Sequence, residues 1–367
     1  MWKEFLFCVM KMYASGFDLF YGIFSLFKLY IIMKKTSLFF LSILFNISSA
    51  FAHDEPWSAS RPDGHAPISV MGDHMHAMGE WMVSYRYMTM EMEGLLKGSN
   101  DISASDANTT YGYNKMMLPK SMTMDMHMFG AMHAISDKWT LMCMLNYLDN
   151  EMTMQGSSMS KMESNGIGDL KVAGLYDLAR WDSGRRIHLN IGLSLPTGSI
   201  DKKSGNNTLG YGMQLGSGTW DFHPAVTYLA QTESYSYGAQ LGGILRAGEN
   251  DQGYTLGNRL DAGIWGARKI TDSLSASLKI DYSSQEEVDG SHKGITSMQK
   301  MMSPANKQDN QGRDITSLGL GLNYYFQNGG LKGHRLATEW ETPLDQKVNG
   351  VQLELDSTWT LGWQYAW

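Results

Sequence analysis

Methionines and histidines are the residues of this 367-residue chain whose types and spacing most directly suggest chemistry. Between Met71 and Met162 lie 20 of its 28 methionines. Thioether sulfur is a soft ligand that suits Cu(I) and binds hard cations poorly. Three runs place Met repeatedly on positions of one parity, so extended chains would align sulfurs on one face. The first of these runs holds Met82, Met88, Met90 and Met92.

A second ligand-rich stretch precedes these runs. Imidazole, thioether and carboxylate side chains together suit copper better than magnesium or calcium. His74 and His76 would project the same way from an extended chain. These residues are therefore candidate copper ligands, weighed against a solvated tail and against methionines that only fill space or touch lipid. The candidate ligands before the first run are His53, His65, Met71, Asp73, His74, Met75, His76 and Met78.

A third set of residues is ionisable and alternates with apolar side chains. Such rows would face a polar interior if the apolar rows face outward. They could pair structurally across a narrow interior or create a field that selects solutes, and the acidic balance of the chain favours cations or neutral solutes. The predicted interior residues are Arg86, Asp125, His127, Asp169, Lys171, His188, Asp221, His223, Arg246, Arg259, Asp261, Lys279, Asp281, Glu339 and Glu341.

A hydrolase site would need a serine and a histidine within hydrogen-bond reach. Ser121 or Ser194 could pair with His127 or His188, but no Gly-x-Ser-x-Gly motif supports such a site. We therefore expect no enzyme activity and no required cofactor, and keep a lipid hydrolase only as the last alternative.

Period-two alternation indicates the elements that must position these residues. At the C-terminus, Trp359, Leu361, Trp363 and Tyr365 share one parity, while small and polar residues occupy the other. Such segments predict about twelve antiparallel strands, with small and polar residues on one row as in a transmembrane β-barrel. The expected strands are 80–92, 121–134, 138–152, 165–180, 185–197, 216–231, 234–247, 254–268, 273–284, 313–327, 331–343 and 354–367.

Connection lengths follow strand parity. The connections after even-numbered strands are short, whereas most after odd-numbered strands are long, notably 93–120, 153–164, 198–215 and 285–312. Outer-membrane barrels have short periplasmic turns and longer outer loops. We therefore predict an all-β fold, an antiparallel barrel in the cell outer membrane, with outer-membrane lipid as one partner.

The N-terminal part has the features of a secretory signal. Lys34 and Lys35 precede a short apolar stretch, and Ala50-Phe51-Ala52 matches a cleavage site. We predict a mis-assigned upstream start over 1–32, a signal peptide over 33–52, a Met/His-rich periplasmic segment over 53–79 and the barrel over 80–367. After cleavage, 25 basic and 35 acidic residues would remain of the 30 and 37 in the whole chain. That acidic balance argues against nucleic acid as a partner.

The aromatic C-terminus is typical of barrels that the barrel-assembly machinery recognises. Tyr365 and Trp367 occupy the relevant positions, with Trp in place of the more usual Phe. We expect this machinery to be a partner through these two residues.

Several segments carry a family resemblance, among them Gly168-Asp169-Leu170, Leu195-Pro196-Thr197-Gly198 and Gln214-Leu215-Gly216-Ser217-Gly218. The chain resembles outer-membrane transporter barrels related to the family of the meta-pathway of phenol degradation. The resemblance spans nearly all of 65–367 and implies passage of a small solute, either aromatic or otherwise hydrophobic or related to a metal. The alternative function is copper binding or copper tolerance at the envelope.

Overall fold

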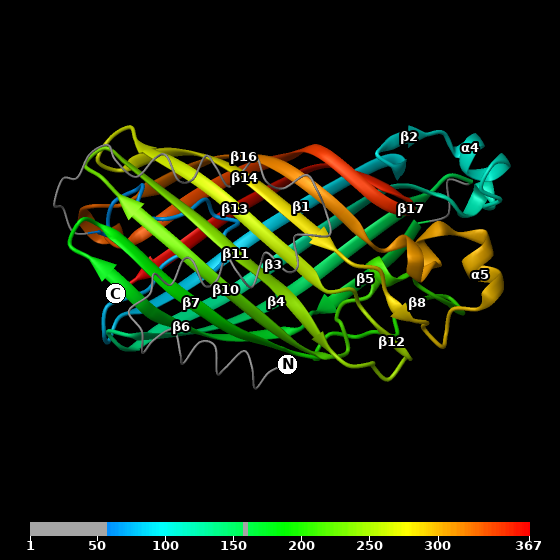
Figure 1. The fold of residues 1–367 in the computed structure, drawn as a ribbon, viewed down its shortest axis with the longest axis horizontal. Coiled ribbons are helices and arrows are strands. Elements are labelled where there is room, and N and C mark those ends of the chain that lie inside the picture. The colour runs from blue at the N-terminus through cyan, green and yellow to red at the C-terminus, as the bar shows by residue number, and fades with distance from the viewer. Residues whose placement is uncertain (1–56, 157–160) are drawn as a thin grey trace, which may run out of the picture. The chain divides into compact units, whose positions relative to one another are not determined.

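The computed structural model describes residues 57–156 and 161–367 and shows a closed antiparallel β-barrel (Figure 1). The strands alternate apolar and polar residues, so each presents one apolar face outward. The predictions for 1–32 and 33–52, and for His53, lie outside the described residues. The wall consists of β1 (Trp81–Gly98), β3 (Pro119–Ser136), β4 (Trp139–Met154), β6 (Leu170–Trp181), β7 (Arg185–Leu195), β10 (Trp220–Gln231), β11 (Tyr235–Ala247), β13 (Arg259–Lys269), β14 (Leu274–Gln285), β16 (Arg313–Tyr325) and β17 (His334–Ala366).

The last element, β17, supplies two wall segments. Eleven strands cannot close a barrel in which every pair is antiparallel, yet β17 pairs antiparallel with both β16 and β1. Its first arm pairs with β16 up to Val348, and its second pairs with β1 from there to Ala366. The reversal lies at Gly350, whose φ is +63°. The predicted count of about twelve strands is therefore confirmed, although the last two form a tighter hairpin than expected.

The two ends of the barrel differ in the length of their connections. One end, called here the turn end, carries short links such as Asp137–Lys138 and the C-terminus (Figure 1). The other, called the loop end, carries the long connections, and β5 (Lys161–Ile167) extends the wall there beside β4. The smaller elements are β2 (Asn100–Ile102), α4 (Ala104–Thr109), η1 (Lys115–Met117), β8 (Lys203–Ser204), β9 (Asn207–Thr208), η2 (Tyr211–Met213), β12 (Tyr254–Thr255), β15 (Asp289–Gly290), α5 (Ser297–Met302), η3 (Pro304–Asn306), η4 (Gln308–Asn310) and, at the turn end, η5 (Gly329–Leu331). Among the described residues, no helix has both the length and the apolar character that a membrane span requires.

The wall follows the predicted alternation in most strands. In β17, Trp359, Leu361 and Trp363 are exposed while Thr360 and Gln364 are buried. The exposed row forms the lipid-facing surface, and the buried row faces the interior.

In β3 the expected orientation is wrong. Met122, Met128 and Met132 are buried, so this methionine row faces the interior and its neighbours face outward. Asp125 and His127, expected inside, therefore lie on the outer face. There Tyr87 donates a hydrogen bond to Asp125, and Tyr85 and His127 share one of 2.7 Å. Tyrosine hydroxyls satisfy these two polar groups, which explains how an outward row can carry them.

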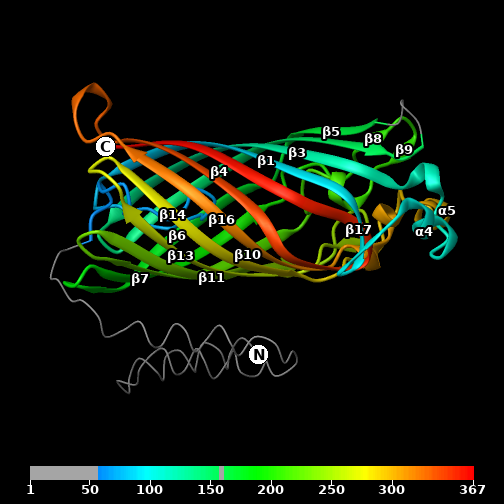
Figure 2. The ribbon, with the colours of Figure 1, turned by 90° about the horizontal axis from the view of Figure 1, so that it is seen from above.

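The segment before β1 also departs from expectation. Residues 57–76 do not form a periplasmic tail but lie inside the turn end of the barrel (Figure 2). Trp57, Ala66 and Val70 pack there against Leu229 and Trp265 of the wall. This segment, called the plug below, fills the turn half of the interior.

Candidate functional site

The plug has little regular secondary structure, so its backbone needs partners other than a sheet. Side chains of the wall supply them. The carbonyl of Gly72 accepts from Asn190 Nδ2 at 3.2 Å and lies 2.8 Å from His188 Nε2. The hydroxyl of Ser275 donates to the carbonyl of Pro62 at 2.8 Å. The inward polar side chains of the wall thus hold the backbone of the plug in place through hydrogen bonds.

Arg335 is one of the wall residues that bind the plug. Its side chain is buried and donates to the carbonyl of Ala66 at 2.8 Å, while also bonding Asn323 and Gln364 of neighbouring strands. One guanidinium therefore ties the plug to the wall, because its five donors can serve several acceptors at once.

A charge cluster forms a second anchor. Lys279 lies within 2.9 Å of carboxylate oxygens of Asp281, Glu339 and Glu341. Lys279 also bonds the hydroxyl of Ser69, whose backbone N–H donates to Glu339 at 2.9 Å. These four wall residues were predicted to line the interior, and the structure places them together against the plug.

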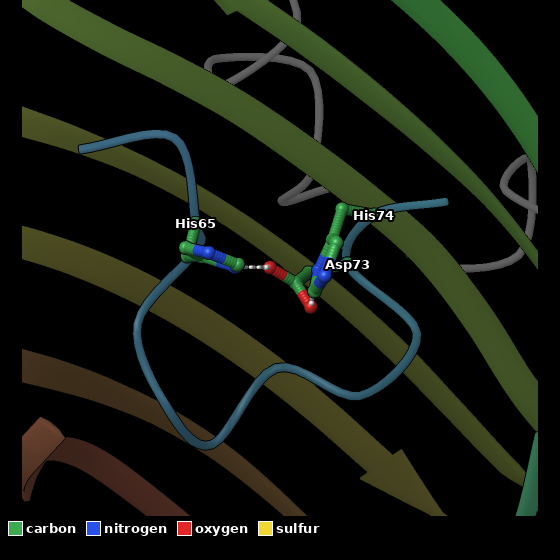
Figure 3. Close-up of side chains that lie close together, drawn as sticks. All are labelled: His65, Asp73 and His74. Carbon is green, nitrogen blue, oxygen red and sulfur yellow. Dashed lines mark hydrogen bonds and ion pairs between the residues drawn. The ribbon is translucent and has the colours of Figure 1, made fainter. Parts of the chain in front are cut away.

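The plug itself brings together four of the predicted metal ligands. Asp73 lies between His65 and His74, 3.9 Å from Nδ1 of the former and 2.8 Å from Nδ1 of the latter (Figure 3). The His74 and His76 rings are 4.9 Å apart, edge to face. All four side chains are buried. The segment of 65–76 therefore gathers three imidazoles and one carboxylate inside the barrel.

Burial and neighbouring charges set the ionisation of this group. Burial, followed by the charge of Arg335, lowers the pKa of His65 well below its usual value. Burial also lowers the pKa of His76 to about 3, assisted by the charge of His74. Burial raises the pKa of Asp73, but the proximity and hydrogen bond of His74 outweigh it, so the pKa falls well below the usual range. At neutral pH the site thus offers the neutral imidazoles of His65 and His76 beside the carboxylate of Asp73.

The predicted methionine ligands do not join this cluster. Met75 packs against Met82 and Met132, and Met71 contributes its backbone carbonyl to Gln240. Met78 is 67% exposed. The remaining three lie further along β1, where Met88 pairs with Met126, and Met90 and Met92 belong to a separate cluster at the loop end.

That loop-end cluster is the main apolar cluster in the half of the interior nearest the loop end. Met92 of β1, Met122 of β3 and Met152 of β4 project inward, and Met213 of the loop between β7 and β10 packs on them. All four are at most 7% exposed. Flexible thioether side chains thus line the interior wall in the loop half of the barrel.

Three cations of the wall lie within range of one another's charge. Lys171 lies within range of the charges of Arg259 and Arg246 and of the carboxylates of Asp169 and Asp221, and it has no hydrogen-bond or ion-pair partner among the described residues. Arg246 pairs with buried Asp221, and Arg259 pairs with Asp261 at 2.7 Å. Among these three described cations, Lys171 is the one without a direct ion pair.

Two further residues predicted to line the interior, Arg86 and His223, lie beside other polar side chains. Arg86 is buried within reach of the charge of Asp73. His223 Nε2 lies 2.6 Å from the hydroxyl of Ser194. The serine–histidine pairs considered from the sequence were others: Ser121 lies on the outer row, and His188 bonds the plug. No carboxylate hydrogen-bonds the ring of His223 among the described residues, so an orienting third group is missing there.

Asp169 links the three most specific sequence motifs. It lies in the break between β5 and β6, where its carboxylate accepts from the backbone N–H of Gly198 at 2.9 Å and of Ser217 at 2.8 Å. The hydroxyl of Thr197 bonds the carbonyl of Gly168 at 2.8 Å. These motifs therefore hold the loop between β7 and β10, which carries Met213, against the wall.

Sequence reasoning missed Arg335 and Asn190 as plug anchors. Arg335 shares its parity with Glu339 and Glu341, so the alternation signal would have identified it as an interior residue. Its hydrogen bond to the plug could not be predicted from the local sequence, because Ala66 of the plug lies about 270 residues away in the chain.

Comparisons with known proteins agree with this architecture. No curated protein matches the sequence. An outer membrane channel from Pseudomonas putida F1 has a similar structure, with a TM-score of 0.61, 13% identity, and coverage of 82% of this chain and 100% of that one. The beta domain of the Bordetella autotransporter BrkA matches at a TM-score of 0.43, with 12% identity over 80% of this chain and 100% of that one.

The family model described as "Putative MetA-pathway of phenol degradation" matches residues 120–341, more than half of the chain. This range runs from β3 into β17 and includes all three motifs that meet at Asp169. The chain, an outer-membrane β-barrel, therefore belongs to this family.

Proposed function

We propose that the protein transports small solutes that combine an apolar body with an anionic group across the outer membrane. The observation that carries the proposal is the interior wall itself, which holds both the methionine cluster and Lys171, a lysine with no hydrogen bond or ion pair among the described residues. Thioether side chains adapt to flat apolar groups, and a lysine ammonium attracts a carboxylate. The family description and the channel from Pseudomonas putida F1 support transport as the function.

This proposal replaces the expectation that cations or neutral solutes pass most easily. That expectation rested on the acidic balance of the whole chain, whereas the wall residues that face the interior include Arg86, Lys171 and Arg335. The charges that line the narrow part of a pore decide its selectivity between ions more than the net charge of the protein does.

The test is the permeability of aromatic against aliphatic carboxylates in planar bilayers. Reversal potentials under bi-ionic conditions give the ratio of benzoate to acetate permeability for the full chain. Met213→Glu should lower this ratio because it places a charge in the methionine cluster, while Met298→Glu, on an exposed methionine of α5, should leave it unchanged. Lys171→Met should lower the permeability of both anions relative to potassium.

Two results would contradict the proposal. The first is the absence of any conductance above that of protein-free bilayers. The second is a benzoate-to-acetate ratio that responds equally to Met213→Glu and Met298→Glu, because the cluster would then play no part in selection.

A further inference from the structure

We propose that the plug contains a zinc-type metal site formed by His65, Asp73 and His74. One ligand atom from each residue can be chosen so that all three atoms lie within 4.8 Å of one another. Tetrahedral zinc with bonds of about 2.0–2.1 Å sets its ligand atoms about 3.3 Å apart. The 3.9 Å between Nδ1 of His65 and Oδ2 of Asp73 is close to this value, whereas the 2.8 Å between Nδ1 of His74 and Oδ1 of Asp73 is a hydrogen bond, so His74 would ligate through Nε2 (Figure 3).

Unsatisfied nitrogens are the second and independent observation. Nδ1 of His65 and Nε2 of His74 are buried and have no hydrogen-bond partner among the described residues. Nε2 of His76, whose ring meets that of His74 edge to face, is in the same condition. Buried polar atoms are normally bonded, so three such atoms within one loop call for a ligand.

A purely structural role explains only part of this arrangement. Asp73 accepts from the backbone N–H of Ala66 at 3.0 Å and contacts His74, which holds the loop of 65–74 in shape. Those contacts occupy Nδ1 of His74 and leave the lone pairs of the other imidazole nitrogens unused. A metal ion would use those lone pairs and cross-link the two ends of the loop.

The donor set and its surroundings define the class of metal. The site offers one carboxylate, and the buried guanidinium groups of Arg86 and Arg335 lie within range of its charge. Magnesium and calcium, which need several oxygen ligands, are therefore disfavoured. Imidazole nitrogens with one carboxylate suit zinc and, secondarily, Cu²⁺. Four of the methionines whose sulfur would favour Cu(I), Met75, Met82, Met90 and Met92, belong to separate apolar clusters.

The experiment measures zinc bound by the full chain in detergent micelles. The protein is stripped with a chelator, incubated with Zn²⁺, desalted and analysed for metal per chain. Zn²⁺ is the probe because cleavage after Ala52 would leave a copper-binding amine at His53. We expect about one zinc per chain. His65→Gln and His74→Gln should each weaken binding at least tenfold, since even indirect partners of ligands cost about that much.

The matched controls are His127→Gln and His133→Gln, which alter histidines on the outer row of β3 and should leave zinc binding unchanged. Heat-dependent gel migration identifies folded barrels, and only folded variants are compared. Co²⁺ added to the unaltered protein gives a measurement that needs no variant, because a tetrahedral site with nitrogen ligands absorbs visible light intensely. Failure of the unaltered protein to retain zinc, or equal retention by His65→Gln and His127→Gln, would overturn the proposal. Either result would leave the transport proposal standing, because that one rests on the loop-end cluster.

Discussion

At the scale of single residues, the interior is built from polar groups whose partners come from distant strands. Lys279 of β14 is the clearest case, since three carboxylates surround it and the side chains of Lys279 and Glu339 are almost fully inaccessible to water. A buried ion pair adds little net stability against an apolar replacement of both partners. Removing one partner, however, leaves the others charged and unpaired.

Lys279→Met should therefore lower the free energy of unfolding by about 3–5 kcal/mol, because it leaves the carboxylates of Asp281, Glu339 and Glu341 without a counter-ion. Urea unfolding in detergent, followed by tryptophan fluorescence, measures this loss. The control is Lys332→Met at an exposed position beside η5, where we expect a change within about 0.5 kcal/mol. Equal losses in the two variants would mean that the charge cluster does not stabilise the barrel.

Sequence reasoning identified the residues of this cluster but not their partners. Period-two alternation places a side chain inside or outside, and it assigned Lys279, Asp281, Glu339 and Glu341 to the interior. It carries no information on which strands face one another across the barrel. The same limit applied to Asp169, which was expected to line the interior and instead holds loop backbone from Gly198 and Ser217.

At the scale of elements, β3 shows where alternation misleads. Met is apolar enough to face lipid, so a row of Met beside a row with Asp125 and His127 favours an outward assignment for Met. The register between β1 and β3 contradicts this outward assignment. It places Met122 of β3 beside Met92 of β1, whose row faces the interior, and His127 beside Tyr87 on the outer face. Polar residues on the outer row are tolerated because tyrosines of the adjacent strand bond them. The correct assignment therefore needed the pairing between strands.

The hairpin within β17 gives a prediction at the same scale. Gly350 has a φ of +63°, and a Cβ there would collide with the side chain of Asn310. Gly350→Ala should cost about 1–2 kcal/mol for the left-handed backbone alone and more for the collision. Urea unfolding of Gly350→Ala in the native and in an Asn310→Ala background separates the two contributions.

In the Asn310→Ala background only the backbone cost of the alanine should remain, so the difference between the two backgrounds reports the collision. Gly330→Ala, at a glycine of η5 with open space around it, serves as the control and should change stability little. A loss at Gly350 no larger than that at Gly330 would show that β17 does not turn sharply there.

At the scale of the whole molecule, charge and apolar surface are distributed unevenly between the inside and outside of the barrel. The sequence predicted a barrel with long loops at one end, and the family resemblance agreed with it. It could not show that 57–76 enter the barrel, because a polar, His-rich stretch has the same composition whether water or a polar wall surrounds it. The bonds from Asn190, Ser275 and Arg335 decide between these alternatives.

The plug packs in the turn half of the barrel and the methionine cluster in the loop half, so we expect them to act as two obstructions along one path. Resistances in series add, so opening one of them leaves the other to limit the current. We expect deletion of 57–76 and Met213→Ala each to raise the conductance only modestly. The doubly altered protein should conduct more than the sum of the two separate increases. Single-channel recordings in planar bilayers measure all three proteins against the unaltered chain, with Met298→Ala as the control in each background. Increases that merely add would mean that solutes bypass one obstruction, and the plug and the cluster would then guard different routes.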